Sequence, residues 1–318
     1  MNEQLDTIKQ KLEELRKLLP GHEELLGEIE KKAAEQAVAP KEQQAPLPEA
    51  KPVPSKAWEA LKLARAADRP HGLQFIAALT EDFLEFHGDR AYSDDQAIAG
   101  GIAMFRGRPI TVICTEKGRA ISQKVKRNFG MPHPEGYRKA LRLMEQAARF
   151  GRPILCLIDT SGAYCGIGAE ERGQGQAIAL NLQRMGVLPV PIVSVIIGEG
   201  FSGGALALGV CDRLIMLENS VYSVITPEGC ASILYKDSKK APEAAAALKM
   251  TAGDLTNLGI CDRIIAEPAG GLRPGNLAPV AQALGDAIEE AFNELSTLDS
   301  QTLLSARYRK YRNVGVAQ

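Results

Sequence analysis

Short β-like runs that alternate with helical stretches constrain the fold of this chain more than any other feature of its sequence. From Trp58 onward, runs rich in β-branched and other apolar residues recur, and stretches with helical spacing lie between them. The predicted strands are 98–105, 109–114, 154–158, 190–197, 213–217 and 263–266, and the predicted helices are 58–67, 73–85, 135–150, 169–185, 203–210, 243–249 and 279–295. This alternation is typical of α/β layers.

Two features depart from a plain doubly wound sheet. The predicted strands 98–105 and 109–114 follow each other without a helix between them. The segment Cys211–Ile215 is echoed by Cys261–Ile265, and both begin with Cys-Asp-Arg. Together these features suggest a repeated strand–strand–helix unit, although the repeat rests on two copies of five residues.

The chain divides into four regions by composition. Residues 1–36 carry Leu and Ile at helical spacing among Lys and Glu, which predicts an amphipathic helical arm. Residues 37–56 contain five prolines, which predicts an extended linker. We expect the main domain to span residues 57–296 and a C-terminal tail to span residues 297–318.

Composition excludes several classes of protein. Lys and Arg total 38 against 39 Asp and Glu, so there is no overall positive charge to hold nucleic acid or an anionic membrane. The longest apolar stretch, 187–197, is shorter than the roughly 20 residues of a membrane span, and the polar N-terminus does not resemble a signal peptide. We therefore expect a cytoplasmic protein. The six cysteines form no Cys-x-x-Cys pair, so we expect neither disulfides nor a metal site.

A glycine-rich turn follows the predicted strand 190–197. Four of the seven residues from Gly198 to Gly204 are glycine, and Ala205–Leu208 predicts the start of a helix. Such a turn directs free backbone N–H groups and the positive end of a helix at one point. That point favours a phosphate, a carboxylate or a developing oxyanion.

Several kinds of site are compatible with this turn. The spacing of its glycines matches the Gly-x-Gly-x-x-Gly fingerprint of dinucleotide-binding folds. The Gly-x-Ser-x-Gly pattern around Ser202 matches a nucleophile elbow, but all four histidines precede Ser202, which excludes the hydrolase order. The N–H groups of Gly203 and Gly204 could instead form an oxyanion hole, or the glycines could simply make a tight turn.

Two further segments could contribute to a site. The loop Asp159–Gly168 also follows a predicted buried strand, and loops at the ends of neighbouring strands would frame one pocket. Residues 117–142 hold eight basic side chains and one acid. This stretch could meet an anionic ligand or an acidic partner, or it could be a solvated basic face.

Seven segments occur in an order that is informative as a set. They are Gly88–Tyr92, Arg127–Pro132, Pro134–Met144, Asp159–Gly168, Ala169–Gln174, Gly198–Ala207 and Pro227–Leu234. In this order they resemble the carboxyltransferase α-subunit family of bacterial multi-subunit acetyl-CoA carboxylases. The resemblance covers about residues 58–271 and includes the placement of the helical arm.

The resemblance implies a fold, a reaction and partners. The fold is α/β, a ClpP/crotonase-type spiral of repeated strand–strand–helix units with an N-terminal helical arm. The reaction moves a carboxyl group from N-carboxybiotin, held on the biotin carboxyl carrier protein, to acetyl-CoA, which gives malonyl-CoA for fatty acid synthesis. The partners are a zinc-ribbon β subunit in an α2β2 heterotetramer and biotin carboxylase, and this chain itself holds no metal.

The resemblance also implies roles for single residues. The backbone N–H groups of Gly203 and Gly204 are expected to form the catalytic oxyanion hole. The residues expected to bind carboxybiotin are Gly162, Ala163, Tyr164, Gly166, Gly200, Phe201 and Ser202. Those expected to contact acyl-CoA or a partner are Lys117, Arg119, Arg127 and Arg138. The alternatives are a stand-alone crotonase-like acyl-CoA hydratase and a non-catalytic assembly subunit.

Three positions depart from the family pattern within the expected site. Ser161 and Cys165 stand where the family usually has proline, which should loosen their loop. Phe201 stands where the family usually has glycine, and it could narrow the entrance of the pocket.

Overall fold

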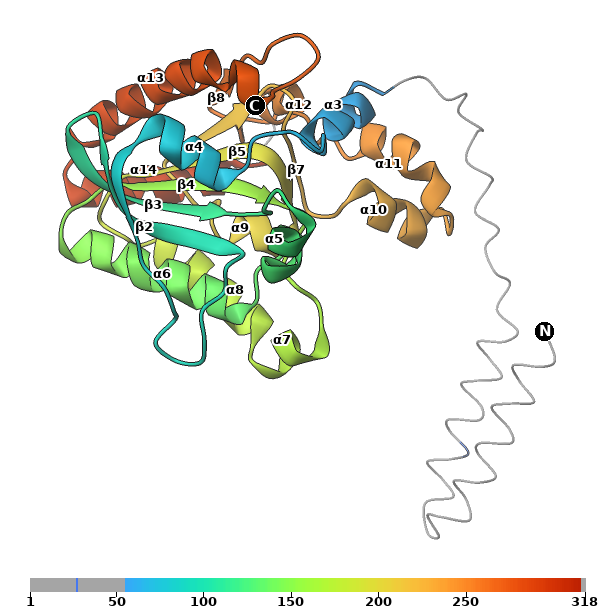
Figure 1. Cartoon of the computed structure of the whole chain (residues 1–318), viewed down its shortest axis with the longest axis horizontal. Helices are drawn as coiled ribbons and strands as arrows, with labels where there is room; N and C mark the ends of the chain where they lie inside the picture. Colours follow the sequence, from blue (N-terminus) through green and yellow to red (C-terminus); the bar gives the residue numbers. More distant parts are fainter. Residues whose placement is uncertain (1–26, 28–54, 316–318) are drawn as a thin grey trace. The chain divides into compact units, whose positions relative to one another are not determined.

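The computed structural model of the chain describes residue 27 and residues 55–315 (Figure 1). The helical arm expected over 1–36 and nearly all of the linker expected over 37–56 lie outside the described residues. Among the described helices, none is both long and apolar enough to cross a lipid bilayer.

One mixed β-sheet organises residues 55–315. In spatial order its strands are β1 (Glu81–Glu85), β2 (Ile98–Phe105), β3 (Arg108–Thr115), β4 (Ile154–Thr160), β5 (Ile192–Phe201), β6 (Arg213–Leu217) and β8 (Arg263–Ile265), and β7 (Val221–Ser223) pairs with β5 off this path. The pairs β1–β2 and β2–β3 are antiparallel, and the other pairs are parallel. The predicted direct succession of two strands is thus confirmed by the β2–β3 hairpin.

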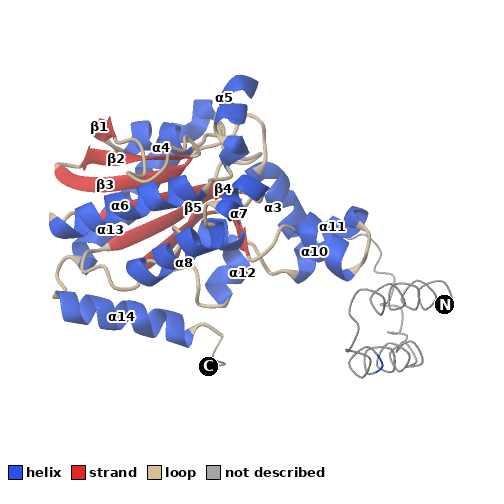
Figure 2. Cartoon of the chain, turned by 90° about the horizontal axis from the view of Figure 1, so that it is seen from below, coloured by secondary structure: helices blue, strands red, loops and turns tan. Residues whose placement is uncertain are grey.

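Helices lie on both faces of the sheet (Figure 1). On one face lie α4 (Gly72–Leu79) and α13 (Leu277–Leu295), and on the other lie α6 (Pro134–Arg149) and α8 (Gln174–Met185). The remaining helices are α3 (Lys56–Ala64), α5 (Ile121–Lys126), η1 (Asn128–Gly130), α7 (Ile167–Glu171), α9 (Ser202–Leu206), α10 (Pro227–Leu234), η2 (Ser238–Lys240), α11 (Ala241–Ala247), α12 (Ala252–Asn257), η3 (Pro274–Asn276) and α14 (Ser300–Asn313). Figures 1 and 2 both show α10 and α11 side by side, beyond the end of the sheet.

Two clusters of buried apolar side chains hold these layers together. The side chains of β4 alternate between them: Leu155 and Leu157 join the cluster that contains α4 and α13, whereas Ile154, Cys156 and Ile158 join the one that contains α6. A strand that is buried on both faces is apolar throughout, which is why the sequence predicted it clearly.

The two Cys-Asp-Arg echoes correspond to equivalent positions in the structure. Asp212 Oδ2 accepts the backbone N–H of Ile192 at 2.8 Å, and Asp262 Oδ2 accepts that of Leu214 at 2.6 Å. Each aspartate therefore accepts a backbone N–H from one of the first two residues of the neighbouring parallel strand. The short sequence repeat reflects a repeated way of starting a strand.

Two predicted helices are wrong in part. The helix predicted over 73–85 ends at Leu79, and its last five residues form β1. Gly101 of β2 permits this pairing, because a Cβ there would lie 1.9 Å from the carbonyl oxygen of Leu84. The helix predicted over 169–185 is two helices, since Gly173 between α7 and α8 has a left-handed φ of 81°.

The segment 297–318, expected to be a tail, contains α14, and this helix packs on the domain. Its Arg307 is 1% exposed, and the guanidinium donates to both carboxylate oxygens of Asp212 at 2.8 and 2.7 Å. It also donates to the carbonyl oxygens of Met185, Leu188 and Val190. Because only Leu303 and Arg307 of α14 are buried, the helix lacks the apolar stripe that would have marked it.

Candidate functional site

The two glycine-rich loops lie against each other at the ends of β4 and β5. The first contains Gly162, whose φ of 139° is one that residues with a side chain rarely adopt. The second is the turn into α9, where Ser202 has a left-handed φ of 61°. A Cβ on Gly204 would lie 2.4 Å from the backbone nitrogen of Ala163. Glycine at 204 therefore lets the two backbones touch.

Strand β5 extends further than the sequence predicted. It continues through Gly198 and Gly200 and ends at Phe201, so the turn is made by Ser202 and Gly203. A dinucleotide fingerprint needs its first glycines in the turn. Since they lie within the strand here, that interpretation of the sequence is wrong.

Phe201 and Gly200 lie inside the domain. The side chain of Phe201 is 0% exposed and packs with Leu61 and Val221. It cannot narrow the entrance of a pocket, so that expectation is wrong. A Cβ on Gly200 would lie 3.0 Å from the ring of Tyr222, which leaves no room for a side chain without a shift of that ring.

The rest of the first loop packs against Pro132 and His133 and is tightly folded around Tyr164. The backbone N–H of Tyr164 donates to the carbonyl oxygen of Pro132 at 2.9 Å, and its ring lies 4.3 Å from that of His133. A Cβ on Gly166 would lie 2.4 Å from Tyr164 Cε1, so glycine is needed beneath this ring. Cys165 between them is exposed. Binding of a ligand by Tyr164 or Gly166 stays a prediction.

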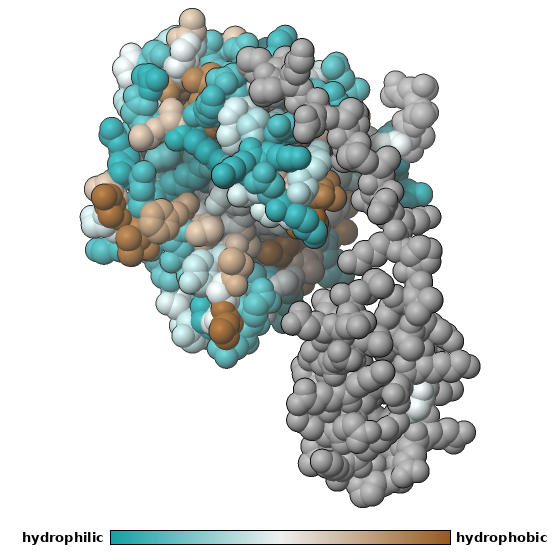
Figure 3. All heavy atoms as spheres, turned by 90° about the vertical axis from the view of Figure 1, so that its right-hand side faces the viewer, coloured by the Kyte–Doolittle hydropathy of each residue, from teal (hydrophilic) through white to brown (hydrophobic). Residues whose placement is uncertain are grey.

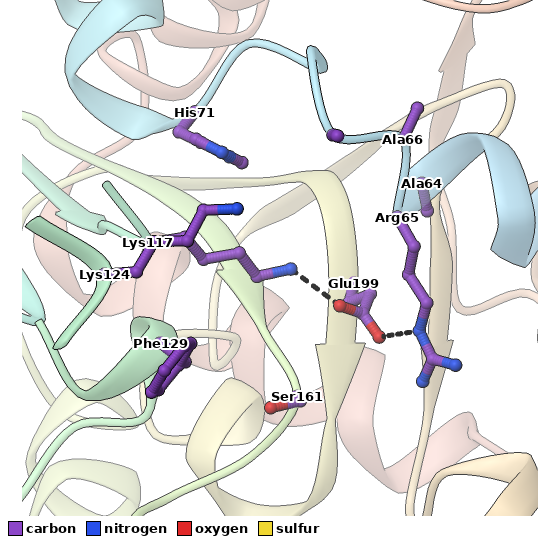
Figure 4. Close-up of a pocket in the computed structure, with 10 residues that line it drawn as sticks. Ala64, Arg65, Ala66, His71, Lys117, Lys124, Phe129, Ser161 and Glu199 are labelled. Atoms are coloured by element: carbon purple, nitrogen blue, oxygen red, sulfur yellow. Dashed lines mark hydrogen bonds and ion pairs between the residues drawn. The ribbon is translucent and has the colours of Figure 1, made fainter. Parts of the chain in front are cut away.

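A cavity of about 260 Å³ opens beside the first loop (Figure 4). Its lining consists of Ala64, Arg65, Ala66, Ala67, His71, Lys117, Lys124, Phe129, Ser161 and Glu199. Ser161 joins the cavity to the loop, because Gly162 follows it directly. The lining holds one carboxylate, that of Glu199, and two of the basic side chains, Arg65 and Lys117, pair with it.

Three charged side chains form what we call the Lys117 ion-pair cluster: Lys117, Asp159 and Glu199. Lys117 Nζ lies 2.7 Å from Asp159 Oδ1 and 2.6 Å from Glu199 Oε2. In Figure 4, Lys117 and Arg65 reach Glu199 from opposite sides, and Arg65 Nε donates to Glu199 Oε1 at 2.7 Å. His71 Nδ1 lies 3.1 Å from Asp159 Oδ2 on the other side of the cluster.

Burial and neighbouring charges shift the pKa values of Asp159 and Lys117 in opposite directions, and the effect of the charges is larger. Burial raises the pKa of Asp159, but Lys117 and His71 favour the carboxylate more strongly, so its pKa lies well below the ordinary value. Burial lowers the pKa of Lys117, but Asp159 and Glu199 raise it above the ordinary value. Both groups are therefore ionised at neutral pH.

The other basic residues expected to meet a ligand or partner differ in availability. Arg138 donates to Asp89 Oδ2 at 2.7 Å and to the carbonyl oxygen of Arg172 at 3.1 Å. Arg127 donates to the carbonyl oxygen of Gln96 at 2.6 Å. Arg119 is exposed, and its guanidinium has no ion-pair partner within residues 55–315. The four basic residues expected to contact acyl-CoA or a partner therefore do not form one group. Of these four, only Lys117 lines the cavity.

Four residues of the site were missed by the sequence analysis as candidates: Arg65, His71, Asp159 and Glu199. Asp159 and Glu199 carried a usable signal, because each is a carboxylate placed where a predicted buried strand meets a glycine-rich segment. Arg65 and His71 lie in the region of α3 and α4, far from either loop in sequence, and no local pattern marked them. Within residues 55–315, no group of three or more His, Cys, Asp or Glu side chains could hold a metal ion.

The chain is similar to known proteins along most of its length. The profile of the family described as "acetyl co-enzyme A carboxylase carboxyltransferase-like" matches residues 1–315. The acetyl-coenzyme A carboxylase carboxyl transferase subunit alpha of Heliobacterium modesticaldum is 59% identical over 259 residues, which cover 81% of this chain and 77% of that protein. The subunit of the same name from Clostridium acetobutylicum is 55% identical over 258 residues, which cover 81% of this chain and 94% of that protein.

A solved structure, that of transcarboxylase 12S, has a similar fold. It matches with a TM-score of 0.56 and 18% sequence identity, over 76% of this chain and 45% of that chain. The chain thus spans less than half the length of that structure. At this level of identity the likeness concerns the fold alone.

Proposed function

Because this chain belongs to the acetyl co-enzyme A carboxylase carboxyltransferase-like family, we propose that it is the α subunit of a biotin-dependent carboxyltransferase. The reaction moves a carboxyl group from carboxybiotin on a carrier protein to acetyl-CoA, which gives malonyl-CoA. The observation that carries this proposal is the match of the family profile to residues 1–315. The comparisons favour neither a stand-alone hydratase nor a non-catalytic subunit.

The first helical turn of α9 is the proposed oxyanion site. The N–H groups at the start of a helix have no partner within it, so those of Gly203 and Gly204 can donate to a substrate oxygen. The contact of Gly204 with Ala163 keeps the loop after β4 beside them. One such donor contributes about 3–4 kcal/mol of transition-state stabilisation.

The proposed donor is planar and carries a carbonyl oxygen. A Cβ on Gly162 would meet Ser202 Cβ at 3.8 Å, an ordinary van der Waals contact, so the loop after β4 and the turn into α9 are neighbours at this point. Biotin, when bound, supplies a ureido ring whose nitrogen carries the carboxyl group and whose oxygen takes up negative charge. We propose that Gly162, Ala163 and Ser202 contact such a ring.

The partners are proposed from the family and from the exposed surface. Five large apolar side chains on helices near the site are each more than half exposed: Ile121, Val125, Ile167, Ile233 and Leu234. Figure 3 faces the side that carries α10 and α11 and shows separate hydrophobic groups among hydrophilic ones. Apolar side chains exposed singly are ordinary on protein surfaces, so the choice of partner rests on the family. We assign them to the zinc-ribbon β subunit of an α2β2 assembly, to which the biotin carboxyl carrier protein and biotin carboxylase deliver the carboxyl group.

The test uses this chain co-purified with its β subunit. We expect the complex to decarboxylate malonyl-CoA with carboxylation of free biotin, and the α chain alone to do neither. Absence of activity in a folded complex would refute the proposed function.

A pair of variants tests the oxyanion role. Gly203→Ala is sterically tolerated, since the nearest atom to the new Cβ is Ile178 Cγ2 at 3.4 Å, but the methyl group limits access to the N–H. We expect kcat to fall at least tenfold. Gly175→Ala in α8 is the matched control, because no atom lies within 4 Å of its Cβ. Equal kcat in the two variants would remove Gly203 from the site.

A further inference from the structure

We propose that Lys117 is a positioning residue for this reaction. With Asp159 and Glu199 it sets how the loop after β4 and the turn after β5 lie relative to each other. The inference rests on the proposed function, in which these two segments hold the reacting groups.

The ladder between β4 and β5 is irregular where the Lys117 ion-pair cluster lies. Ile158 pairs with Ile196, but Thr160 pairs with Gly200. A step of two residues on β4 is therefore matched by a step of four on β5, so β5 bulges between these pairs. Regular hydrogen bonds to β4 therefore do not hold β5 between Ile196 and Gly200, whereas its other edge pairs with β7 from Glu199 onward.

In the bulge, buried side chains replace the backbone of β4 as hydrogen-bond partners of the β5 backbone. The N–H of Glu199 donates to Asp159 Oδ1 at 2.9 Å, and the carbonyl oxygen of Ile197 accepts from Arg69 Nε at 2.9 Å. Asp159 is itself held, because its N–H donates to Thr115 Oγ1 at 2.6 Å. The position of the bulge thus depends on the Asp159 carboxylate.

The positive charge of Lys117 allows the carboxylates of Asp159 and Glu199 to lie close together. The side chains of Lys117, Asp159 and Glu199 are 14%, 1% and 6% exposed, so solvent screens their charges weakly. Without the ammonium group, the two carboxylates would repel each other and separate β4 from β5. Lys117 itself is held in place by Gly130, since a Cβ there would lie 2.5 Å from Lys117 Cγ.

Each carboxylate is close in sequence to one half of the proposed site. Asp159 precedes Gly162 by three residues, and Glu199 precedes Gly203 by four. Gly204 packs directly against the backbone of Ala163, so one of the two segments cannot shift without moving the other. A shift within the Lys117 ion-pair cluster must therefore move the N–H groups relative to the cavity.

The experiment compares Lys117→Met with Lys117→Arg in the complex with the β subunit. Each variant is assayed for malonyl-CoA-dependent carboxylation of free biotin, and the fraction of assembled complex is measured in parallel. We expect Lys117→Met to lower kcat at least tenfold per assembled complex, with KM for malonyl-CoA changed less than twofold. Lys117→Arg should recover kcat to within about threefold of the unchanged protein, because arginine can also bridge two carboxylates. Arg309→Met, on the exposed face of α14 and outside the basic stretch 117–142, is the control and should leave both constants unchanged.

The outcomes separate this inference from the proposed function. An inactive complex of the unchanged protein refutes the function. If the unchanged complex is active, and Lys117→Met lowers only the fraction of assembled complex and leaves kcat per complex unchanged, the positioning role is refuted. If Lys117→Met does not assemble, Glu199→Gln decides, since it removes one arm of the cluster and also a buried negative charge. We expect a kcat at least fivefold lower for Glu199→Gln, and an unchanged kcat would overturn the inference.

Discussion

Replacement of Gly198 by alanine probes the packing on which the site depends. A Cβ at this position would lie 2.4 Å from Asp159 Oδ1, 2.7 Å from Cγ and 3.1 Å from Oδ2. Ordinary contacts need about 3.5 Å, so the carboxylate must move by about 1 Å. The hydrogen bond from Glu199 N–H, now 2.9 Å long, would then be broken.

The expected loss of stability follows from two contributions. A hydrogen bond to a charged group contributes about 1.5–3 kcal/mol, and forcing a methyl group into a packed interior costs about 1–3 kcal/mol. We therefore expect the free energy of unfolding to fall by about 2.5–6 kcal/mol for Gly198→Ala. In a domain of this size that lowers Tm by roughly 5–24 °C.

Thermal unfolding of the full chain, followed by circular dichroism, measures this change. The control is Gly175→Ala, whose Cβ would meet no atom within 4 Å. In the first turn of α8, alanine should match or raise the stability by up to about 1 kcal/mol. A Tm for Gly198→Ala within 2 °C of the unchanged protein would show that the Asp159 carboxylate is not held in place as the structure indicates.

Three further predictions concern charge and exposure. Because the pKa of Asp159 is lowered in the fold by Lys117 and His71 despite burial, its contribution to stability is complete above the unfolded pKa of about 3.9 and is lost as the pH falls. Urea unfolding between pH 6 and pH 3 should therefore show a fall in the free energy of unfolding that is less steep in Asp159→Asn. Cys165 is the exposed thiol and the other five cysteines are buried, so a thiol reagent should modify one group rapidly in the native chain and none in Cys165→Ser. Arg307→Met leaves the Asp212 carboxylate buried without its partner and should cost about 3–5 kcal/mol in urea unfolding, whereas Met at the exposed Arg309 should change stability by less than about 0.5 kcal/mol.

Six of the eight strands within residues 55–315 were predictable from sequence, but β1 and β7 were not. The apolar runs at β4 and β5 were recognised because both faces of these strands are buried. β1 was predicted as the end of a helix, since its residues continue the pattern of α4 and only the pairing with β2 decides otherwise. The crotonase-type fold implied by the resemblance is confirmed by the similarity in fold to transcarboxylase 12S.

The candidate site was predictable as two loops but not as a network of charges. Gly162, Ala163, Gly203 and Gly204 were named from sequence, and the structure brings them together. Phe201 was misplaced, because its neighbours in the core come from α3 and β7, and no local pattern reveals them.

The amino-acid sequence by itself determined which segments become buried strands, where glycine interrupts them and to which family the chain is similar. These properties depend on the order of residues along a few turns or strands, so they can be read locally. Only the tertiary structure decided that Lys117 pairs with carboxylates 42 and 82 residues away, that β5 bulges beside them and that α14 contributes a buried guanidinium. Burial and charge pairing arise when distant segments are packed together, and neither is a property of any one segment.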